Sequence, residues 1–200
     1  MSRILWLLPV LLILPTLVLV GGDDDAEPMR AAQSGGPDLL QIAERGDVSA
    51  LDALLKRSAD ANMRDNCDWT PLMKAAVNGH VEAARRLLDA GAAVDAADKG
   101  GYTALLLAAS NNHAELVDLL LAHSAMIDAQ EQTQGYTPLI WAAHRGHAQT
   151  VQVLLQHGAD ATLPDFEGHA AAWHATAQGH APVAALLSGS AAPATAQLGG

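Results

Sequence analysis

The sequence repeats itself with a period of 33 or 34 residues, and this repeat restricts the possible folds more than any other feature. One position of the repeat is occupied by Thr70, Thr103, Thr137 and Ala170. These residues are 33, 34 and 33 positions apart, and the same steps separate the histidines His80, His113, His147 and His180. A weaker copy of the pattern precedes them in residues 38–64. A unit of this length cannot bury its own apolar residues, so the units must stack and share one continuous core.

Each unit is predicted to form two short helices joined by a tight turn. Thr-Pro at Thr70 and Thr137 begins a helix, because threonine caps the free N–H groups of the first turn and proline has no N–H to leave unpaired. The paired alanines in "LMKAA", "LLLAA" and "LIWAA" allow close approach of neighbouring backbones. Glycine before the histidine, or Asn112 in one unit, supplies the left-handed residue that ends this helix. Apolar positions such as Val151 and Leu154 then face the neighbours of a second helix.

The repeated T-P-L-x-x-A-A-x-x-G-H-x-x-x-V-x-x-L-L-x-x-G-A-D pattern resembles the ankyrin repeat from Asp38 to about Leu187. The resemblance implies an all-α solenoid of about five helix–turn–helix units, each followed by a hairpin loop, with atypical units as caps at both ends. We place the units at residues 38–64, 65–97, 98–130, 131–164 and 165–187. The sequence departs from the pattern at Ala104, which replaces proline, and in the last unit, which lacks Thr-Pro. The loop "AQEQTQG" has one extra residue, so we expect a longer hairpin loop before Gly135.

Residues 1–22 differ from the rest of the chain. An apolar run of 17 residues extends from Ile4 to Val20 and includes two prolines. A comfortable membrane span needs about 20 residues, so the run favours a signal peptide that is cleaved before Asp23. An uncleaved N-terminal membrane anchor is the alternative. In both cases the positive charge of Arg3 stays inside, and the rest of the chain crosses the membrane.

These features predict an exported protein. We expect it in the periplasm of a bacterium, or anchored to the inner membrane with the repeats facing the periplasm. Residues 23–37 and 188–200 are small, polar and rich in proline and glycine. We expect a flexible linker in the first of these segments and a disordered tail in the second.

The charge and the polar residues argue against several classes of function. The formal net charge is −11, so the chain lacks the positive surface that binds nucleic acid. Cys67 is the only cysteine, which excludes an internal disulfide. His144 and His147 lie three positions apart but lack a third metal ligand at a fixed spacing, so we expect no metal site. Common enzyme motifs are absent from the sequence. The chain is therefore predicted to be non-catalytic and to need no cofactor.

The repeating histidines have a structural explanation. Each stands directly after the residue that ends the first helix of its unit, and we expect it to tie the backbones of adjoining loops by a hydrogen bond. His123 and His157 also recur, at a spacing of 34 residues. Six of the nine histidines therefore belong to the repeat.

The candidate binding residues are Trp69, Tyr102, Tyr136 and His169. Each stands directly before the repeat position that holds Thr70, Thr103, Thr137 or Ala170, which we call the anchor position. The resemblance implies that they form a solvent-facing row along the hairpin edge of a concave face. Aromatic residues and arginine dominate protein interfaces. Further residues at positions that contact partners in the family are Asn66, Lys99, Ser110, Asn111, Gln134, His144, Arg145, Glu167 and Gln178. The alternative is that each ring only packs on the next hairpin loop.

The predicted function is a non-catalytic protein–protein interaction module that presents its concave face to a partner outside the cytoplasm. The alternative is a chaperone-like or protective factor for an exported enzyme. If the row binds the partner, replacing Tyr102 and Tyr136 with alanine is expected to weaken binding and to leave thermal unfolding nearly unchanged.

Overall fold

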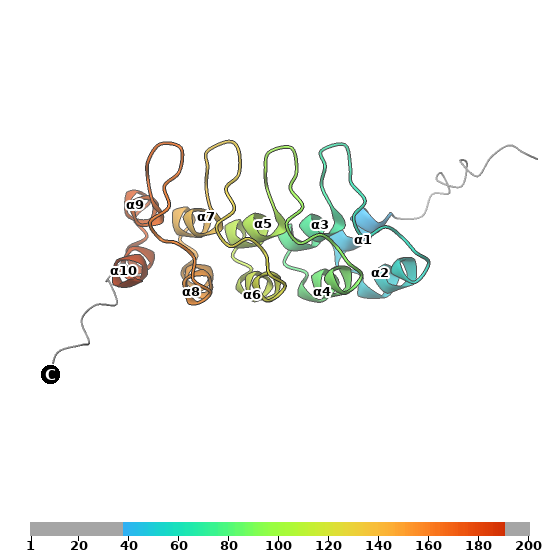
Figure 1. The fold of residues 1–200 in the computed structure, drawn as a ribbon. Helices are drawn as coiled ribbons and strands as arrows, with labels where there is room; N and C mark the ends of the chain where they lie inside the picture. The colour runs from blue at the N-terminus through green and yellow to red at the C-terminus, as the bar shows by residue number, and fades with distance from the viewer. Residues whose placement is uncertain (1–37, 191–200) are drawn as a thin grey trace, which may run out of the picture. The chain divides into compact units, whose positions relative to one another are not determined.

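A computed structural model describes residues 38–190, which form ten helices and no strand (Figure 1). The helices lie in two rows that pack on each other. The first-row helices are α1 (Leu39–Arg45), α3 (Pro71–Val77), α5 (Ala104–Ser110), α7 (Pro138–His144) and α9 (Ala171–Ala177). The second-row helices are α2 (Val48–Leu55), α4 (Val81–Asp89), α6 (Ala114–Ala122), α8 (Ala148–Gln156) and α10 (Ala181–Ser190). Each helix packs on its pair partner and on the next helix of its own row. This arrangement confirms the predicted all-α repeat solenoid.

Hairpin loops precede four of the first-row helices. We call them finger 1 (residues 65–69), finger 2 (98–102), finger 3 (131–136) and finger 4 (165–169). The ribbon shows the fingers side by side on the same side of the helix rows (Figure 1). A single antiparallel bridge, between Ala97 and Thr103, is the only strand-like pairing in the part of the chain that the structure describes.

The predicted helix signals are present in the structure. The side-chain oxygens of Thr70, Thr103 and Thr137 accept hydrogen bonds from the N–H three residues on, at 3.3, 3.3 and 3.1 Å. These bonds satisfy donors that the first helical turn leaves free. Asn112 ends α5 with φ 62°, the left-handed conformation that glycine adopts in the other units. Helices α4, α6 and α8 begin directly after the repeating histidines His80, His113 and His147, whose side chains make no cap bond. Helix α2 instead begins after Asp47, whose side chain accepts from the N–H of Ala50.

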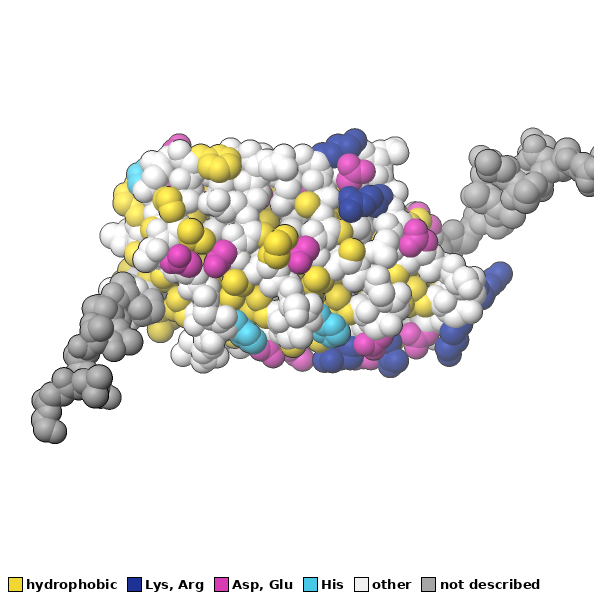
Figure 2. All heavy atoms as spheres, viewed as in Figure 1, with side chains coloured by type: hydrophobic (Ala, Val, Ile, Leu, Met, Phe, Trp, Pro, Cys, Tyr) yellow, Lys and Arg dark blue, Asp and Glu magenta, His cyan; other side chains and the backbone are white. Residues whose placement is uncertain are grey.

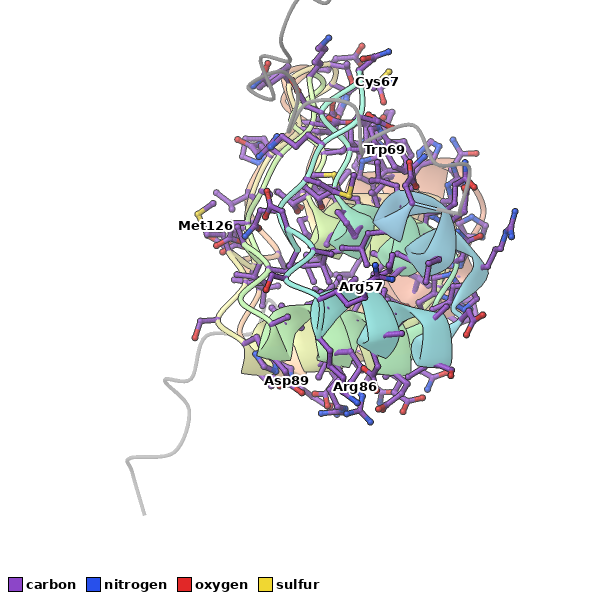
Figure 3. The ribbon with its side chains drawn as sticks, turned by 90° about the vertical axis from the view of Figure 1, so that its right-hand side faces the viewer. Arg57, Cys67, Trp69, Arg86, Asp89 and Met126 are labelled. Atoms are coloured by element: carbon purple, nitrogen blue, oxygen red, sulfur yellow. The ribbon has the colours of Figure 1, made fainter. Side chains whose placement is uncertain are left out.

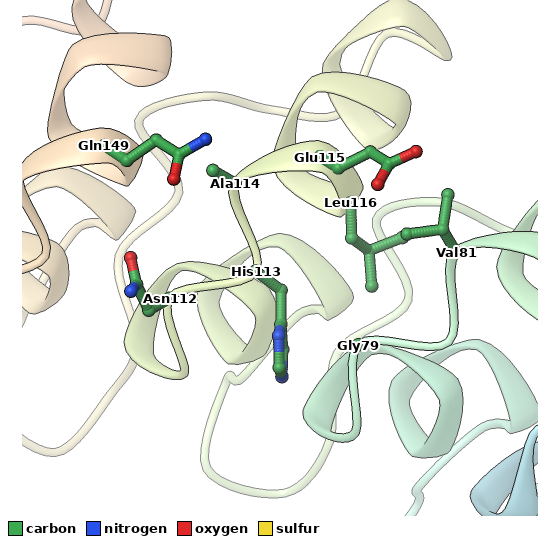
Figure 4. A pocket seen from close by; sticks show the side chains of 8 residues that line it. All are labelled: Gly79, Val81, Asn112, His113, Ala114, Glu115, Leu116 and Gln149. Atoms are coloured by element: carbon green, nitrogen blue, oxygen red, sulfur yellow. The ribbon is translucent and has the colours of Figure 1, made fainter.

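The repeating histidines connect neighbouring units as expected. The ring Nε2 of His80, His113, His147 and His180 lies 3.0–3.1 Å from a backbone carbonyl of the preceding unit. The ring of His113 extends towards the loop at Gly79, in the pocket between the two units (Figure 4). A Cβ at Gly79 would lie 2.5 Å from this ring, and the residue has φ 71°. Glycine is therefore required there both by its backbone conformation and by the close approach of the next unit.

The core runs without interruption through the stack. Leucines and alanines of both rows are fully buried, among them Leu72, Leu105 and Leu139 in the first row and Leu120 and Leu154 in the second. Small alanines let the helices approach closely, so the core needs few large side chains.

The ends of the repeat domain differ from the predictions in one respect. We expected the last unit to end at 187, but α10 continues to Ser190. The first residues of the predicted disordered tail are therefore helical. The predicted signal peptide or anchor (residues 1–22), the linker (23–37) and the rest of the tail (191–200) lie outside the described residues.

Candidate functional site

The first residue of each finger is acidic. Its side chain accepts a hydrogen bond from the backbone N–H of the residue before the anchor position. In finger 2, Asp98 accepts hydrogen bonds from the N–H groups of Gly100 at 2.8 Å and Tyr102 at 2.9 Å. The N–H of Asp98 donates in turn to the carbonyl of Tyr102 at 3.0 Å. Equivalent bonds hold Trp69 in finger 1 and His169 in finger 4. The same pattern of hydrogen bonds to an aspartate therefore sets the backbone conformation at Trp69, Tyr102 and His169.

Finger 3 has the expected extra residue, and a longer acid accommodates it. Glu131 stands where the other fingers have aspartate, and its carboxylate accepts from the N–H groups of Gln134 at 2.9 Å and Tyr136 at 3.0 Å. It also accepts from the N–H and the hydroxyl of Thr133. Glu131 is fully buried. Burial alone would raise its pKa, but these hydrogen bonds lower the pKa below the ordinary value.

The predicted row is not uniformly exposed. Trp69, Tyr102 and His169 are half-buried, whereas Tyr136 is only 9% exposed and belongs to the core. The expectation that all four residues face solvent is therefore wrong for Tyr136. The physical reason is a set of large neighbours. Trp141 of the same unit and His174 of the next unit lie against the Tyr136 ring, with centroids 5.1 and 4.8 Å away.

An aromatic cluster spans the two C-terminal units. It contains Tyr136, Trp141, His144 and His174, whose ring centroids lie 4.8–6.2 Å apart in five pairs. Most of these pairs meet edge to face, the favourable arrangement for aromatic rings. Tyr102 extends the cluster towards finger 2, with its ring 6.3 Å from Trp141. The cluster thus joins residues that come from three units of the repeat.

Two large apolar side chains next to this cluster remain exposed. Trp173 is 49% exposed and stacks on His169, with centroids 3.7 Å apart and planes within 11° of parallel. Phe166, in finger 4, is 65% exposed. Arg145 is exposed as well, and its guanidinium lies 5.5 Å from the centre of the Trp141 ring. Exposed aromatic side chains beside an arginine are typical of protein-binding surfaces.

All phenylalanine, tryptophan and tyrosine residues of the described part of the chain lie in the fingers or the first-row helices. They are Trp69, Tyr102, Tyr136, Trp141, Phe166 and Trp173. The second-row helices have none. Seen from the α1 end, Trp69 and Cys67 lie on the finger side of the domain and Arg86 on the opposite side (Figure 3). The two sides of the domain therefore differ in the kind of side chain that they can offer to a partner.

A comparison with protein families identifies this architecture. The family model described as "Ankyrin repeats (3 copies)" matches residues 39–131 and 126–196. The chain belongs to the ankyrin repeat family. Ankyrin repeats generally act as protein–protein interaction modules, and the family is typically non-catalytic. A search of curated proteins found no significant match.

Three features of the ankyrin domain bear on metal binding, membrane insertion and thiol exposure. In residues 38–190, no three histidine, cysteine, aspartate or glutamate side chains come together in a group that could hold a metal ion. Within the same residues, every helix is too short or too polar to cross a membrane. Cys67 is exposed in finger 1.

The last ankyrin finger contains a buried acid–histidine pair. Asp165 Oδ2 lies 2.7 Å from His174 Nε2, and the two side chains are 1% and 3% exposed. Asp165 also accepts from the N–H groups of Glu167 at 2.9 Å and His169 at 2.8 Å. Burial alone would raise the pKa of Asp165, but these bonds and the charge of His174 lower it below the ordinary value. The pair connects finger 4 to α9.

His144, singled out in the sequence, lies inside the aromatic cluster rather than on an open surface. Burial, and then electrostatic interactions with His174, Arg145 and His180, lower its pKa and so favour the neutral ring. Its Nδ1 is buried without a hydrogen-bond partner, as is Nε1 of the neighbouring Trp141. These two side chains therefore contact the rest of the cluster through ring packing.

Four further predicted contact residues lie on the surface, and they are Asn66, Lys99, Asn111 and Gln134. Glu167 and Gln178 are also exposed, whereas Ser110 is half-buried. The backbone carbonyl of Asn66 accepts from the Lys99 ammonium at 2.6 Å, which links fingers 1 and 2. Gln134 is exposed in finger 3. Its backbone carbonyl accepts a hydrogen bond from the N–H of Phe166 at 3.0 Å, which links fingers 3 and 4. Asn111 is exposed at the end of α5. None of these four contributes a ring to the aromatic cluster.

Sequence reasoning missed Trp141, Phe166, Trp173 and His174. Trp173 stands at the helix position that holds Met73, Leu106 and Ile140 in the earlier units, and all three of those residues are buried. Trp173 is exposed because no further helix pair follows it in the described stack. Alignment of the units would have shown that Trp173 occupies a core position of the repeat in the last unit, where no later unit of the described stack covers it.

Proposed function

We propose that this ankyrin repeat domain binds a partner protein through the face formed by its fingers and first-row helices, centred on the two C-terminal units. The observation that carries the proposal is the distribution of phenylalanine, tryptophan and tyrosine, which in residues 38–190 are confined to this face. Trp173, Phe166 and Arg145 supply the exposed part of the surface. Rigid rings of this kind bury a large area on binding, and truncation of such an anchor typically costs about 2 kcal/mol or more.

The packed cluster beneath these residues supports the same proposal. Trp173 is stacked on His169, and Arg145 lies over Trp141, so the exposed groups are already held in place. A preformed surface loses less conformational entropy on binding than a mobile one.

Affinity capture with the full chain tests this proposal. The double substitution Trp173→Ala and Arg145→Ala should weaken binding of the captured protein by about 30-fold or more, because the exposed anchors are lost. Helical circular dichroism should change little, since both side chains are exposed. The control pairs Arg85→Ala with Gln152→Ala, which are exposed on second-row helices. Equal binding by the anchor variant and the control would place the interface elsewhere.

We further propose that the domain acts outside the cytoplasm. The proposal rests on the apolar run from Ile4 to Val20 and on the acidic residues that follow it. A fusion of the first 30 residues to a reporter enzyme that is active only outside the cytoplasm should give an active reporter. The mass of the mature chain then distinguishes cleavage before Asp23 from a retained anchor. An inactive reporter, produced at normal levels, would rule export out.

A further inference from the structure

The space between fingers 3 and 4 contains a pocket of about 230 Å³. We call it the finger-tip pocket. Its lining consists of Thr133, Gln134, Tyr136, Asp165, Phe166 and Glu167. Pockets for drug-sized ligands have about 300–1,000 Å³. The finger-tip pocket is smaller, so it suits one long side chain rather than a whole small molecule.

The pocket combines aromatic rings with negative charge. Phe166 packs over Gly135 of the neighbouring finger and stays 65% exposed, so its outer part is open to a ligand. Tyr136 is nine-tenths buried, and its hydroxyl makes no hydrogen bond within the described residues. Asp165 and Glu167 line the same pocket as Tyr136. Burial raises the pKa of Tyr136, and the charges of Asp165, Glu167 and Glu131 raise it further. The surroundings of the Tyr136 hydroxyl therefore favour a positive group.

Within residues 38–190, no lysine or arginine side chain pairs with Asp165, Glu167 or Glu131. Asp165 and Glu167 pair only with His174 and His169, and the Glu167 side chain is 81% exposed. Between residues 100 and 190 the sequence contains one lysine or arginine, Arg145, and this residue lies over Trp141. The lysine and arginine side chains visible in Figure 2 lie towards the α1 end of the domain.

Fingers 1 and 2 show what such a cation does when the chain provides it. Arg64, directly before finger 1, donates to the backbone carbonyl of Ala97 at 2.8 Å. Lys99 of finger 2 donates to the backbone carbonyl of Asn66 at 2.6 Å. At the position of Arg64, the unit of finger 3 has the neutral Gln130, which bonds to the carbonyl of Pro164 at 2.9 Å. The first inter-finger space thus holds cations of the chain itself, whereas the finger-tip pocket holds none.

We infer that the finger-tip pocket receives the cationic end of a lysine or arginine side chain of the partner protein. The Phe166 ring offers its face to the cation, the Tyr136 hydroxyl accepts a hydrogen bond, and Glu167 neutralises the charge at the open side. The inference rests on the proposed protein-binding function and specifies the chemistry of one contact.

Titration of the full chain with small probes, followed by amide NMR, tests this inference. The cationic probes are N-acetyl-arginine amide and N-acetyl-lysine amide, and the neutral control is N-acetyl-citrulline amide. At least one cationic probe should cause saturable shifts at the amides of Thr133, Phe166 and Glu167, whereas citrulline should not. Phe166→Ala and Glu167→Gln should each weaken binding of the probe about three- to fivefold. Glu115→Gln, an exposed change of the same charge on α6, should leave it unchanged.

Several outcomes would overturn the inference. Equal shifts with citrulline would show a pocket that does not select charge, and equal shifts with Mg²⁺ or Ca²⁺ would show a metal site. Unchanged binding by Glu167→Gln would exclude the proposed role of that carboxylate. If the cationic probes fail while the partner protein is still captured through Trp173 and Arg145, the inference is wrong and the proposed function stands. If capture fails too, the proposed function is also wrong.

Discussion

Replacing Tyr136 with alanine is expected to lower the free energy of unfolding by about 3–5 kcal/mol, the usual cost of truncating a buried aromatic side chain. The ring is 9% exposed and packs edge to face on Trp141 and His174. Removing it leaves a cavity between two units of the repeat. Urea unfolding followed by circular dichroism measures the change. This result would differ from our expectation from the sequence, in which Tyr136 was an exposed contact residue with little effect on stability.

Two control variants make the Tyr136 result specific. Tyr102→Ala removes a half-buried ring whose centroid is 6.3 Å from Trp141, and it should cost clearly less. Tyr136→Phe keeps the ring and should unfold at nearly the same urea concentration as the unmodified chain. If Tyr136→Ala is no more destabilising than Tyr102→Ala, then the tyrosine does not hold the two C-terminal units together.

Replacing Asp165 with alanine should be similarly severe, with a loss of about 3–5 kcal/mol, because it breaks a buried pair and leaves His174 without its partner. The N–H groups of Glu167 and His169 also lose their acceptor. Units of a repeat protein are stabilised mainly by their nearest neighbours. The loss should therefore appear in hydrogen exchange as faster opening of residues 165–190, with little change in residues 38–97.

Asp98→Ala is the matched control for Asp165→Ala. Asp98 closes finger 2 with the same backbone bonds, but it is half-buried and has no histidine partner. Its loss should cost about 2 kcal/mol, because it removes two hydrogen bonds with a net value of about 1 kcal/mol each. Equal destabilisation by the two variants would show that the pair with His174 adds nothing to the stability.

The Asp165 variant also has an expected effect on the pH dependence of stability. The pKa of Asp165 is lowered in the folded state, so its contribution is complete above the ordinary aspartate pKa of about 3.9. The contribution is lost as the pH falls through the lower folded-state value, because protonation removes the charge that the hydrogen bonds stabilise. The difference in stability between the unmodified chain and Asp165→Ala should therefore shrink as the pH falls below about 4.

The repeat period predicted the fold because its signals are local. The threonine N-caps and the left-handed conformation of Asn112 depend on a few neighbouring residues. The hydrogen bonds of the repeating histidines depend only on the adjacent copy of the same pattern. The longer finger 3 was also predicted from one extra residue. Its closure by Glu131 follows the same logic, since a longer side chain spans the longer loop.

The burial of Tyr136 could not be predicted in this way. Tyr102 and Tyr136 occupy the same position of the repeat, yet only Tyr136 is buried. The difference comes from the first-row helices, where one position holds Lys74, Leu107, Trp141 and His174 in successive units. Two adjacent large rings at this position, Trp141 and His174, cover Tyr136. Exposure at one column of a repeat thus depends on the side chains in another column.

We propose that a partner protein binds the face formed by the fingers and first-row helices of the two C-terminal units. Hydrogen exchange of the full chain, alone and in complex with the captured partner, tests where the partner binds. Slower exchange in the complex is expected in residues 131–145 and 165–174, with little change in α2, α4 and α6. Protection confined to those second-row helices, with none in fingers 3 and 4, would contradict the claim.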